Sequence, residues 1–155
     1  MIQYLSGDIF QSTMQTLVNP VNTVGVMGSG LACEFSRRYP EMLNVYKQHC
    51  QDGSFKMGTL WIYRAFDKWI LNFPTKKHWR DPSELIYIEA GLTTFVRTYE
   101  VRGITSIAFP KLGCGLGKLG WPPVRILFEK YLGSIEIPIE VYAYGSIASS
   151  EKVPW

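Results

Sequence analysis

Hydrophobic and polar positions along the chain follow two alternating periods, one typical of strands and one typical of helices. Short apolar runs bounded by Gly, Pro, Asn or Asp predict strands at residues 1–6, 16–18, 60–66, 68–73, 104–109 and 137–144. Apolar residues that recur every three or four positions predict helices at residues 31–39, 40–51, 82–102 and 122–132. Strands and helices therefore alternate through most of the chain.

Turn-forming residues set the expected ends of these elements. Asn19 and Pro20 are expected to stop the second strand, because proline lacks the N–H that a sheet ladder uses. The runs at 60–66 and 68–73 predict an antiparallel hairpin that ends at Pro74.

The sequence Asp81-Pro82-Ser83-Glu84 has the form of a helix start. Asp81 is the expected N-cap, Pro82 fits the first helical position and Glu84 fits the third. Gly103 is the expected C-cap of the same long amphipathic helix.

This order of elements predicts an α/β fold in which helices cover both faces of a mixed sheet. Ligands of such folds bind at the carboxyl ends of central strands. Residues 1–145 are expected to form one domain, and residues 146–155 are interpreted as an exposed tail or a truncation point.

Composition narrows the function classes. The chain has 155 residues, of which 46% are hydrophobic and 19% charged, and no apolar run reaches the roughly 18 residues of a membrane span. Met1 leads directly into a strand pattern without the segments of a secretory signal, so we expect no membrane association and a cytoplasmic location. The net charge of +3 permits an anionic ligand without requiring nucleic acid.

Cysteine usage argues against a disulfide framework and against a metal site. Cys33, Cys50 and Cys114 form an odd set without a C-x-x-C pair or a histidine at ligand spacing. Cys114 has no base partner in the sequence, so we interpret it as a small loop residue rather than a nucleophile. No cofactor is expected.

Two glycine-rich loops each follow a predicted strand and precede a predicted helix, one from Gly25 to Gly30 and one with Gly113, Gly115 and Gly117. Glycine permits positive φ angles, which let several N–H groups face one anion beside a helix N-terminus. One such loop is equally consistent with a tight turn, whereas two together favour a diphosphate site. Neither matches the phosphate loop of ATPases or the dinucleotide fingerprint of dehydrogenases.

Two polar residues that follow strands have two interpretations each. Asp8 is either an N-cap or an acceptor for the amino hydrogens of an adenine. Asn22 either closes a turn or offers a donor and an acceptor to sugar hydroxyls, and we favour the ligand role.

The segment from Phe73 to Arg80 places three cations, a histidine and a tryptophan after the predicted hairpin. It is either a solvated basic loop or a reactive one, because Lys76, Lys77 and Arg80 would lower one another's pKa and a neutral lysine is a nucleophile. His78 is interpreted as a hydrogen-bonding loop residue. Trp79 is either a stacking platform for a base or a cap on the core.

Four segments carry a recognisable combination of motifs over nearly the whole chain. They are Gly7-Asp8, Val21 to Ala32, Asn72 to Arg80, and Phe109 to Gly117 with Trp121. Together they resemble the macrodomain family, and within it the branch of the DarG antitoxins and the vertebrate terminal ADP-ribose glycohydrolase. The resemblance implies a three-layer α/β/α fold around a mixed central sheet.

The resemblance also implies an ADP-ribose site, with Asp8 on the adenine, the glycine loops on the diphosphate and Asn22 on the distal ribose. Lys76 would be the catalytic residue, attacking the anomeric carbon of that ribose. The implied contacts are Asp8, Ile9, Asn22, Gly25, Met27, Gly28, Gly30, Leu31, Ala32, Gly113, Cys114, Gly115, Leu116 and Gly117.

By the same resemblance, the substrate is ADP-ribose attached to thymine bases of single-stranded DNA, and the activity reverses a DarT-like toxin, which is a further implied partner. We expect a monomer whose DNA contacts include Lys77, His78, Trp79 and Arg80. Gly117 and Gly120 stand where relatives carry acids, and Pro20 stands where a threonine is common. Two alternatives stay open: a module that binds ADP-ribose without hydrolysing it, and a hydrolase of ADP-ribose esters on protein glutamates.

Overall fold

The computed structural model describes residues 1–144, which form one six-stranded sheet with the strand order β1-β6-β5-β2-β4-β3. Neighbouring strands are parallel except for the β3–β4 hairpin, so the prediction of a mixed sheet is confirmed. The strands are β1 (Ile2–Ser6), β2 (Thr16–Asn22), β3 (Trp61–Arg64), β4 (Trp69–Lys76), β5 (Ile107–Pro110) and β6 (Ile139–Tyr144).

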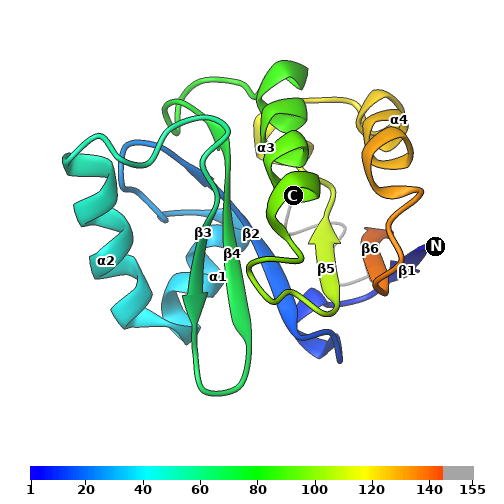
Figure 1. Cartoon of the computed structure of the whole chain (residues 1–155). Coiled ribbons are helices and arrows are strands. Elements are labelled where there is room, and N and C mark those ends of the chain that lie inside the picture. Colours follow the sequence, from blue (N-terminus) through cyan, green and yellow to red (C-terminus); the bar gives the residue numbers. More distant parts are fainter. Residues whose placement is uncertain (145–155) are drawn as a thin grey trace.

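Helices cover both faces of this sheet, which gives the expected three layers (Figure 1). Within residues 1–144 the α-helices are α1 (Gly30–Arg38), α2 (Pro40–Gln51), α3 (Leu85–Thr98) and α4 (Trp121–Leu132). Short 3-10 helices, η1 (Ile9–Gln11) and η2 (Gly115–Gly117), lie in two of the loops. None of the helices described here is long and apolar enough to cross a membrane.

Alternate side chains of the central strands supply two hydrophobic cores. In β5, Ile107 and Phe109 pack toward α3 and α4, whereas Ala108 packs toward α1 and α2. The central strands are apolar on both sides because both faces of a mainly parallel sheet are covered. Residues 146–155, interpreted above as a tail, lie outside the described residues.

Two prolines do not end their strands, contrary to the sequence prediction. β2 continues through Pro20 to Asn22, and β4 continues through Pro74 to Lys76. β5 pairs with β2 only at Thr16 and Leu17, and β3 pairs with β4 only as far as Asn72. Each proline therefore lies where its strand has a partner on one side only, and a missing N–H is tolerated there. Lys76 is consequently the last residue of a strand rather than a loop residue.

The predicted start of the long helix is also wrong. α3 begins at Leu85, with Glu84 as an extended N-cap whose side chain makes no capping bond. The Ser83 N–H instead donates to the carbonyl oxygen of Gly117 (2.9 Å), which ties this segment to the second glycine loop. At the other end the helix stops at Thr98, and Gly103 (φ +83°) closes the turn that follows. The remaining boundaries agree with the predictions to within a few residues.

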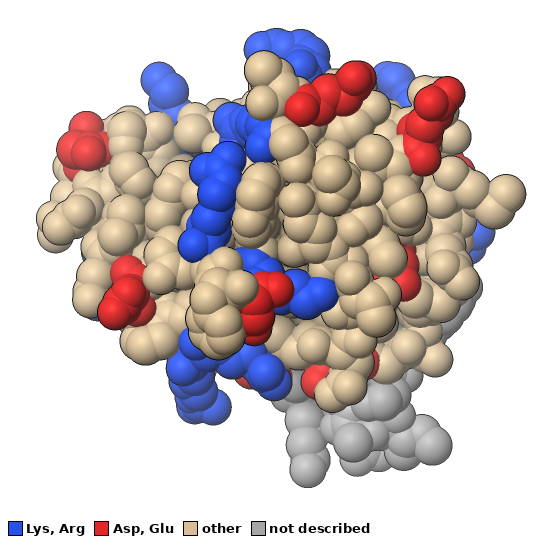
Figure 2. Space-filling model, turned by 60° about the horizontal axis from the view of Figure 1, so that its bottom comes forward, with Lys and Arg blue, Asp and Glu red and all other residues tan. Residues whose placement is uncertain are grey.

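The end of the sheet at which β4 begins carries a band of basic side chains. Figure 2 brings this end, at the bottom of Figure 1, toward the viewer. Arg102 donates to the Leu60 carbonyl oxygen (2.7 Å), and the Arg64 guanidinium carbon lies 4.5 Å from the Trp69 ring centroid. Because these cations bind carbonyl oxygens and an aromatic face of their own chain, they stabilise the fold at this end. Phe66, in the β3–β4 turn, is fully exposed.

Candidate functional site

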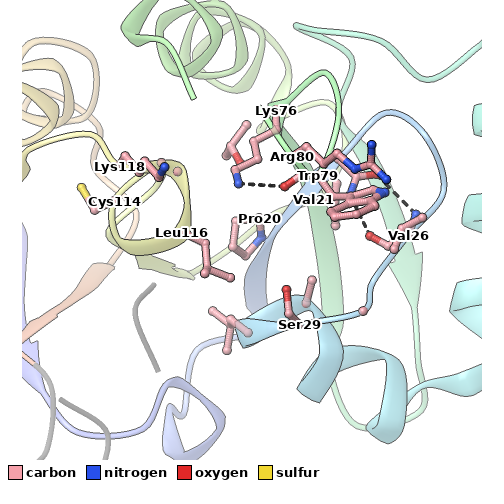
Figure 3. Close-up of a pocket in the computed structure, with 17 residues that line it drawn as sticks. Pro20, Val21, Val26, Ser29, Lys76, Trp79, Arg80, Cys114, Leu116 and Lys118 are labelled. Atoms are coloured by element: carbon pink, nitrogen blue, oxygen red, sulfur yellow. Dashed lines mark hydrogen bonds between the residues drawn. The ribbon is translucent and has the colours of Figure 1, made fainter. Parts of the chain in front are cut away.

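A cavity of about 510 Å³ opens at the carboxyl ends of β2 and β4, where the fold class predicts a ligand site. The end of β2 forms its floor, and its walls come from the first glycine loop with α1, the segment after β4, and the second glycine loop (Figure 3). The lining residues are Pro20, Val21, Asn22, Val26, Gly28, Ser29, Leu31, Ala32, Thr75, Lys76, Trp79, Arg80, Gly113, Cys114, Leu116, Gly117 and Lys118.

Asn22 shapes the first glycine loop through its side-chain amide. The amide nitrogen donates to the Val26 carbonyl oxygen (2.8 Å), and the amide oxygen accepts from the Val24 N–H (3.1 Å) and the Tyr46 hydroxyl (2.7 Å). These are the contacts of the turn-closing interpretation, although Asn22 also lines the cavity. Its contact with a ribose stays a prediction.

The first turn of α1 borders the cavity. Ser29, the N-cap, has an extended backbone and makes no side-chain capping bond. The N–H groups of a helix's first turn have no partner within the helix, and together with the helix dipole they favour an anion. Leu31 and Ala32 line the cavity from this turn, so the predicted place for a diphosphate lies at its wall.

The second glycine loop needs its glycines for two different reasons. Gly113 and Gly115 have φ angles of +76° and +71°, which favour glycine. Gly117 does not have a positive φ angle. A Cβ at this position would lie 2.4 Å from Ser83 Oγ and 3.0 Å from Ser83 Cβ. Ser83, buried before α3, therefore fills the space that any side chain at 117 would enter.

Gly117→Ala is expected to lower the free energy of unfolding by about 1–3 kcal/mol, because the added methyl group overlaps Ser83. Ser83→Gly removes the obstructing side chain, so the double variant should recover most of the loss. Denaturant unfolding of the four proteins of this cycle measures the coupling. Additive effects would contradict the contact.

Lys76 reaches the cavity from the end of β4, and its Nζ donates to the Trp79 carbonyl oxygen (3.3 Å). Burial lowers the pKa of Lys76, the nearby Lys118 ammonium lowers it further, and Asp81 acts in the opposite direction. For Lys76 the direction of the pKa shift agrees with the sequence prediction. The cause differs, because burial and Lys118, rather than Lys77 and Arg80, lower the pKa of Lys76.

The basic segment after Lys76 divides into two parts. Trp79 and Arg80 line the cavity, with the Arg80 guanidinium carbon 4.6 Å from the Trp79 ring centroid. Lys77 and His78 do not line it: the Lys77 ammonium lies 5.7 Å from the Tyr87 ring centroid, and His78 Nδ1 accepts from the Arg80 N–H (3.1 Å). Trp79 is 48% exposed, so it is a rim residue rather than a cap on the core.

Several other predicted contacts lie away from the lining. The Asp8 carboxylate accepts from the Phe10 N–H (2.9 Å) and so caps η1, while Ile9 and Met27 belong to the core between the sheet and α1. Contacts of these residues with ADP-ribose stay predictions. The predicted residues outside the lining are Asp8, Ile9, Gly25, Met27, Gly30, Gly115, Lys77 and His78.

Sequence reasoning missed six of the lining residues, which are Pro20, Val21, Val26, Ser29, Thr75 and Lys118. Lys118 could have been predicted from the sequence, because it is a cation that directly follows the second glycine loop. Cys114 lines the cavity but is nearly buried, and burial raises the pKa of its thiol to about 11, which agrees with its interpretation as a loop residue.

The charge of the lining is one-sided. Lys76, Arg80 and Lys118 line the cavity, and among the described residues no carboxylate does. Within residues 1–144 no group of three or more His, Cys, Asp or Glu side chains is placed to hold a metal ion. The described lining thus favours an anionic organic ligand.

A family model described as "Macro domain" matches residues 18–127, which include the floor and all three walls of this cavity. The chain belongs to the macrodomain family. This macrodomain is 47% identical over 129 residues to a "DNA ADP-ribosyl glycohydrolase" of Mycobacterium tuberculosis, a match that covers 81% of the chain and 37% of the relative. It therefore spans little more than a third of that relative's length.

Solved structures give the same relationship. The macrodomain superposes on the "Macrodomain of Mycobacterium tuberculosis DarG" with a TM-score of 0.87 and 42% identity, covering 91% of this chain and 96% of that one. It also matches "Thermosipho africanus DarTG in complex with ADP-ribose", with a TM-score of 0.85 and 39% identity, covering 94% of this chain and 42% of that one. The resemblance inferred from the motifs is thus confirmed.

Proposed function

We propose that this macrodomain is an ADP-ribosyl glycohydrolase that removes ADP-ribose from thymine bases of single-stranded DNA. The observation that carries the proposal is the position of Lys76, whose amino group lies in a cavity lined by cations and a protonated thiol. A lysine with a lowered pKa is more often neutral, and a neutral amine is a nucleophile. The name of a similar protein, "DNA ADP-ribosyl glycohydrolase", supports the activity and DNA as the class of substrate.

Lys76 serves as the nucleophile at the anomeric carbon of the distal ribose. Its neutral amine forms a bond to that carbon while the bond to the thymine nitrogen breaks. The base leaves with the bonding electron pair and gains the proton that the amine gives up. The ribose ring then opens to a Schiff base, and water hydrolyses it to ADP-ribose and the free lysine.

The rest of the cavity holds the nucleotide. The first turn of α1 and the second glycine loop face each other across the floor and supply N–H groups to the two phosphates (Figure 3). The basic lining compensates the charge of the diphosphate. The complex of Thermosipho africanus DarTG with ADP-ribose supports this choice of ligand.

Trp79 and Arg80 line the cavity with Lys76. In this proposal they hold the base and a neighbouring phosphate of the DNA. Lys77, exposed beside them, adds charge for a further phosphate. We further propose that the protein acts as a monomer in the cytoplasm, and that it reverses the modification made by a DarT-like toxin.

Trp79→Ala should raise KM for the modified oligonucleotide by roughly 5- to 100-fold, because a stacked base is lost, with a smaller effect on the affinity for free ADP-ribose. Phe66→Ala is the matched control, since Phe66 is an exposed aromatic at the opposite end of β4. Steady-state kinetics and calorimetry provide the two measurements. If Trp79→Ala weakened the binding of the oligonucleotide and of free ADP-ribose equally, Trp79 would contact the ADP-ribose rather than the DNA.

One observation favours a second candidate function, a module that binds ADP-ribose without hydrolysis. In the described part of the chain no carboxylate lines the cavity to assist the lysine, and Ser83 occupies the space beside Gly117 where one could project.

The test of the proposed function compares two substrates with the wild-type protein. One is a single-stranded oligonucleotide with one ADP-ribosylated thymine, and the other is a peptide with one ADP-ribosylated glutamate. We expect chromatography to detect ADP-ribose released from the oligonucleotide. Release from the peptide alone would assign the activity to esters, and tight binding without release from either would support the binding module.

A further inference from the structure

Lys118 adopts a backbone conformation that lysine disfavours. Its φ angle is +66°, and it is the one non-glycine residue within residues 1–144 with a positive φ. At the other positive-φ positions of this part of the chain the residue is glycine. A lysine in the left-handed region costs free energy relative to glycine, and such outliers occur preferentially at functional sites. The unfavourable backbone of Lys118 therefore points to a role for its side chain.

Lys118 borders the cavity that Lys76 also lines. Lys118 directly follows η2, whereas Lys76 ends β4 on the other side of β2, and both line the same cavity (Figure 3). Lys118 is exposed, and no carboxylate within residues 1–144 forms an ion pair with it. No described ion pair therefore neutralises the positive charge that Lys118 brings to the cavity wall.

The charges around Lys76 come from three segments. Lys118 on the second glycine loop disfavours the protonated amine, and Asp81 before α3 favours it. Arg80 lines the cavity beside Trp79, and the buried Cys114 thiol is uncharged at neutral pH because burial raises its pKa to about 11. Lys118 and Asp81 thus have opposite effects on the protonation of Lys76.

We infer that Lys118 is a positioning residue whose charge, placed at the cavity wall by a left-handed backbone, favours the neutral, nucleophilic form of Lys76. A lysine beside a second cation is an established way to activate an amine. The catalytic consequence rests on the proposed function, because it requires Lys76 to attack the ribose. The effect of the Lys118 charge on the protonation of Lys76 does not depend on the proposed function, because it involves no substrate.

A direct test measures the protonation of Lys76 without any substrate. The protein is acylated briefly with acetic anhydride at a series of pH values, and mass spectrometry of peptides gives the extent of modification at Lys76. Lys118→Met removes the charge, Lys118→Gly removes it and also relieves the backbone strain, and Lys118→Arg keeps it. Lys111→Met is the matched control, since Lys111 precedes the loop and does not line the cavity.

We expect Lys118→Met and Lys118→Gly to shift the modification profile of Lys76 to higher pH, because protonation becomes easier when position 118 loses its charge. Lys118→Arg and the control Lys111→Met should leave the profile in place. Raising the salt concentration should reduce the difference, since salt screens exposed charges. A profile for Lys76 that is the same in all variants would overturn the inference.

The pH–rate profile tests the catalytic consequence. Activity requires the neutral amine, so kcat/KM rises with pH through the Lys76 pKa. At neutral pH Lys118→Met and Lys118→Gly should lose roughly three- to tenfold in kcat/KM, and they should recover at high pH. A constant loss at every pH would indicate a merely structural role and overturn this consequence. If no variant or wild type releases ADP-ribose, the proposed function fails, whereas a shifted modification profile still supports the effect on Lys76.

Discussion

Lys76→Ala should reduce the release of ADP-ribose from a modified oligonucleotide by at least about 1,000-fold, because no other described amine both lines the cavity at the end of β4 and has a lowered pKa. The affinity for ADP-ribose should change only a few-fold, since the glycine loops and the first turn of α1 remain intact. Single-turnover kinetics and calorimetry separate the two quantities.

Two further variants make this result specific. Lys76→Arg keeps the positive charge and tests whether charge alone suffices, and we expect it to be as inactive as the alanine variant because arginine stays protonated. Lys111→Ala removes a lysine outside the cavity and should retain wild-type activity. Normal turnover by Lys76→Ala would refute the lysine mechanism, and turnover by Lys76→Arg would assign Lys76 an electrostatic role.

Gly91→Ala should destabilise the protein at least as strongly as Gly117→Ala. Gly91 lies on the buried face of α3, and a Cβ there would meet Phe73 Cζ at 2.2 Å and Cε1 at 2.4 Å. Phe73 is fully buried in β4, so its ring has no free space to enter. Even with the better helix propensity of alanine, we expect the free energy of unfolding to fall by about 2–3 kcal/mol in denaturant titrations.

Gly120→Ala is the matched control for this substitution. Gly120 precedes α4 with a φ of −71°, and an added Cβ would have only ordinary contacts, the nearest being Pro123 Cδ at 3.7 Å. Because Gly120 is the N-cap of α4, where alanine is less favourable than glycine, the stability of this variant should fall by no more than about 1 kcal/mol. Equal stabilities of the two variants would mean that α3 can move away from the sheet at Phe73.

Local sequence signals predicted the elements whose boundaries depend on nearby residues. α2 runs from Pro40 to Gln51 as predicted, because proline fits the first helical position and Asp52-Gly53 ends the periodic pattern. Pro20 misled the same reasoning, since the effect of a missing N–H depends on which strand lies alongside, and β5 separates from β2 before that point. Strand pairing is not local and leaves no signal in the residues next to the proline.

In the candidate site, too, local sequence predicted some features, whereas others depend on the tertiary structure. The glycine loops and Lys76 stand out in the sequence because residue type and spacing suggest their chemistry. The effect of Lys118 on Lys76 could not be predicted in this way, because the two residues line one cavity only when β4 and the loop after β5 are placed on either side of β2. The turn-closing contacts of Asn22 likewise involve Tyr46 on α2, whose position only the tertiary structure gives.

The contact between Ser83 and Gly117 also constrains how the candidate site can evolve. An acid introduced at 117 in one step would overlap Ser83, so the first mutant on that route would be destabilised. Prior loss of the Ser83 side chain, in a segment far from 117 in the sequence, would remove this overlap. Directed evolution toward a lysine–carboxylate pair should therefore succeed more readily from a Ser83→Gly parent than from the wild type, an epistasis set by the order of two substitutions.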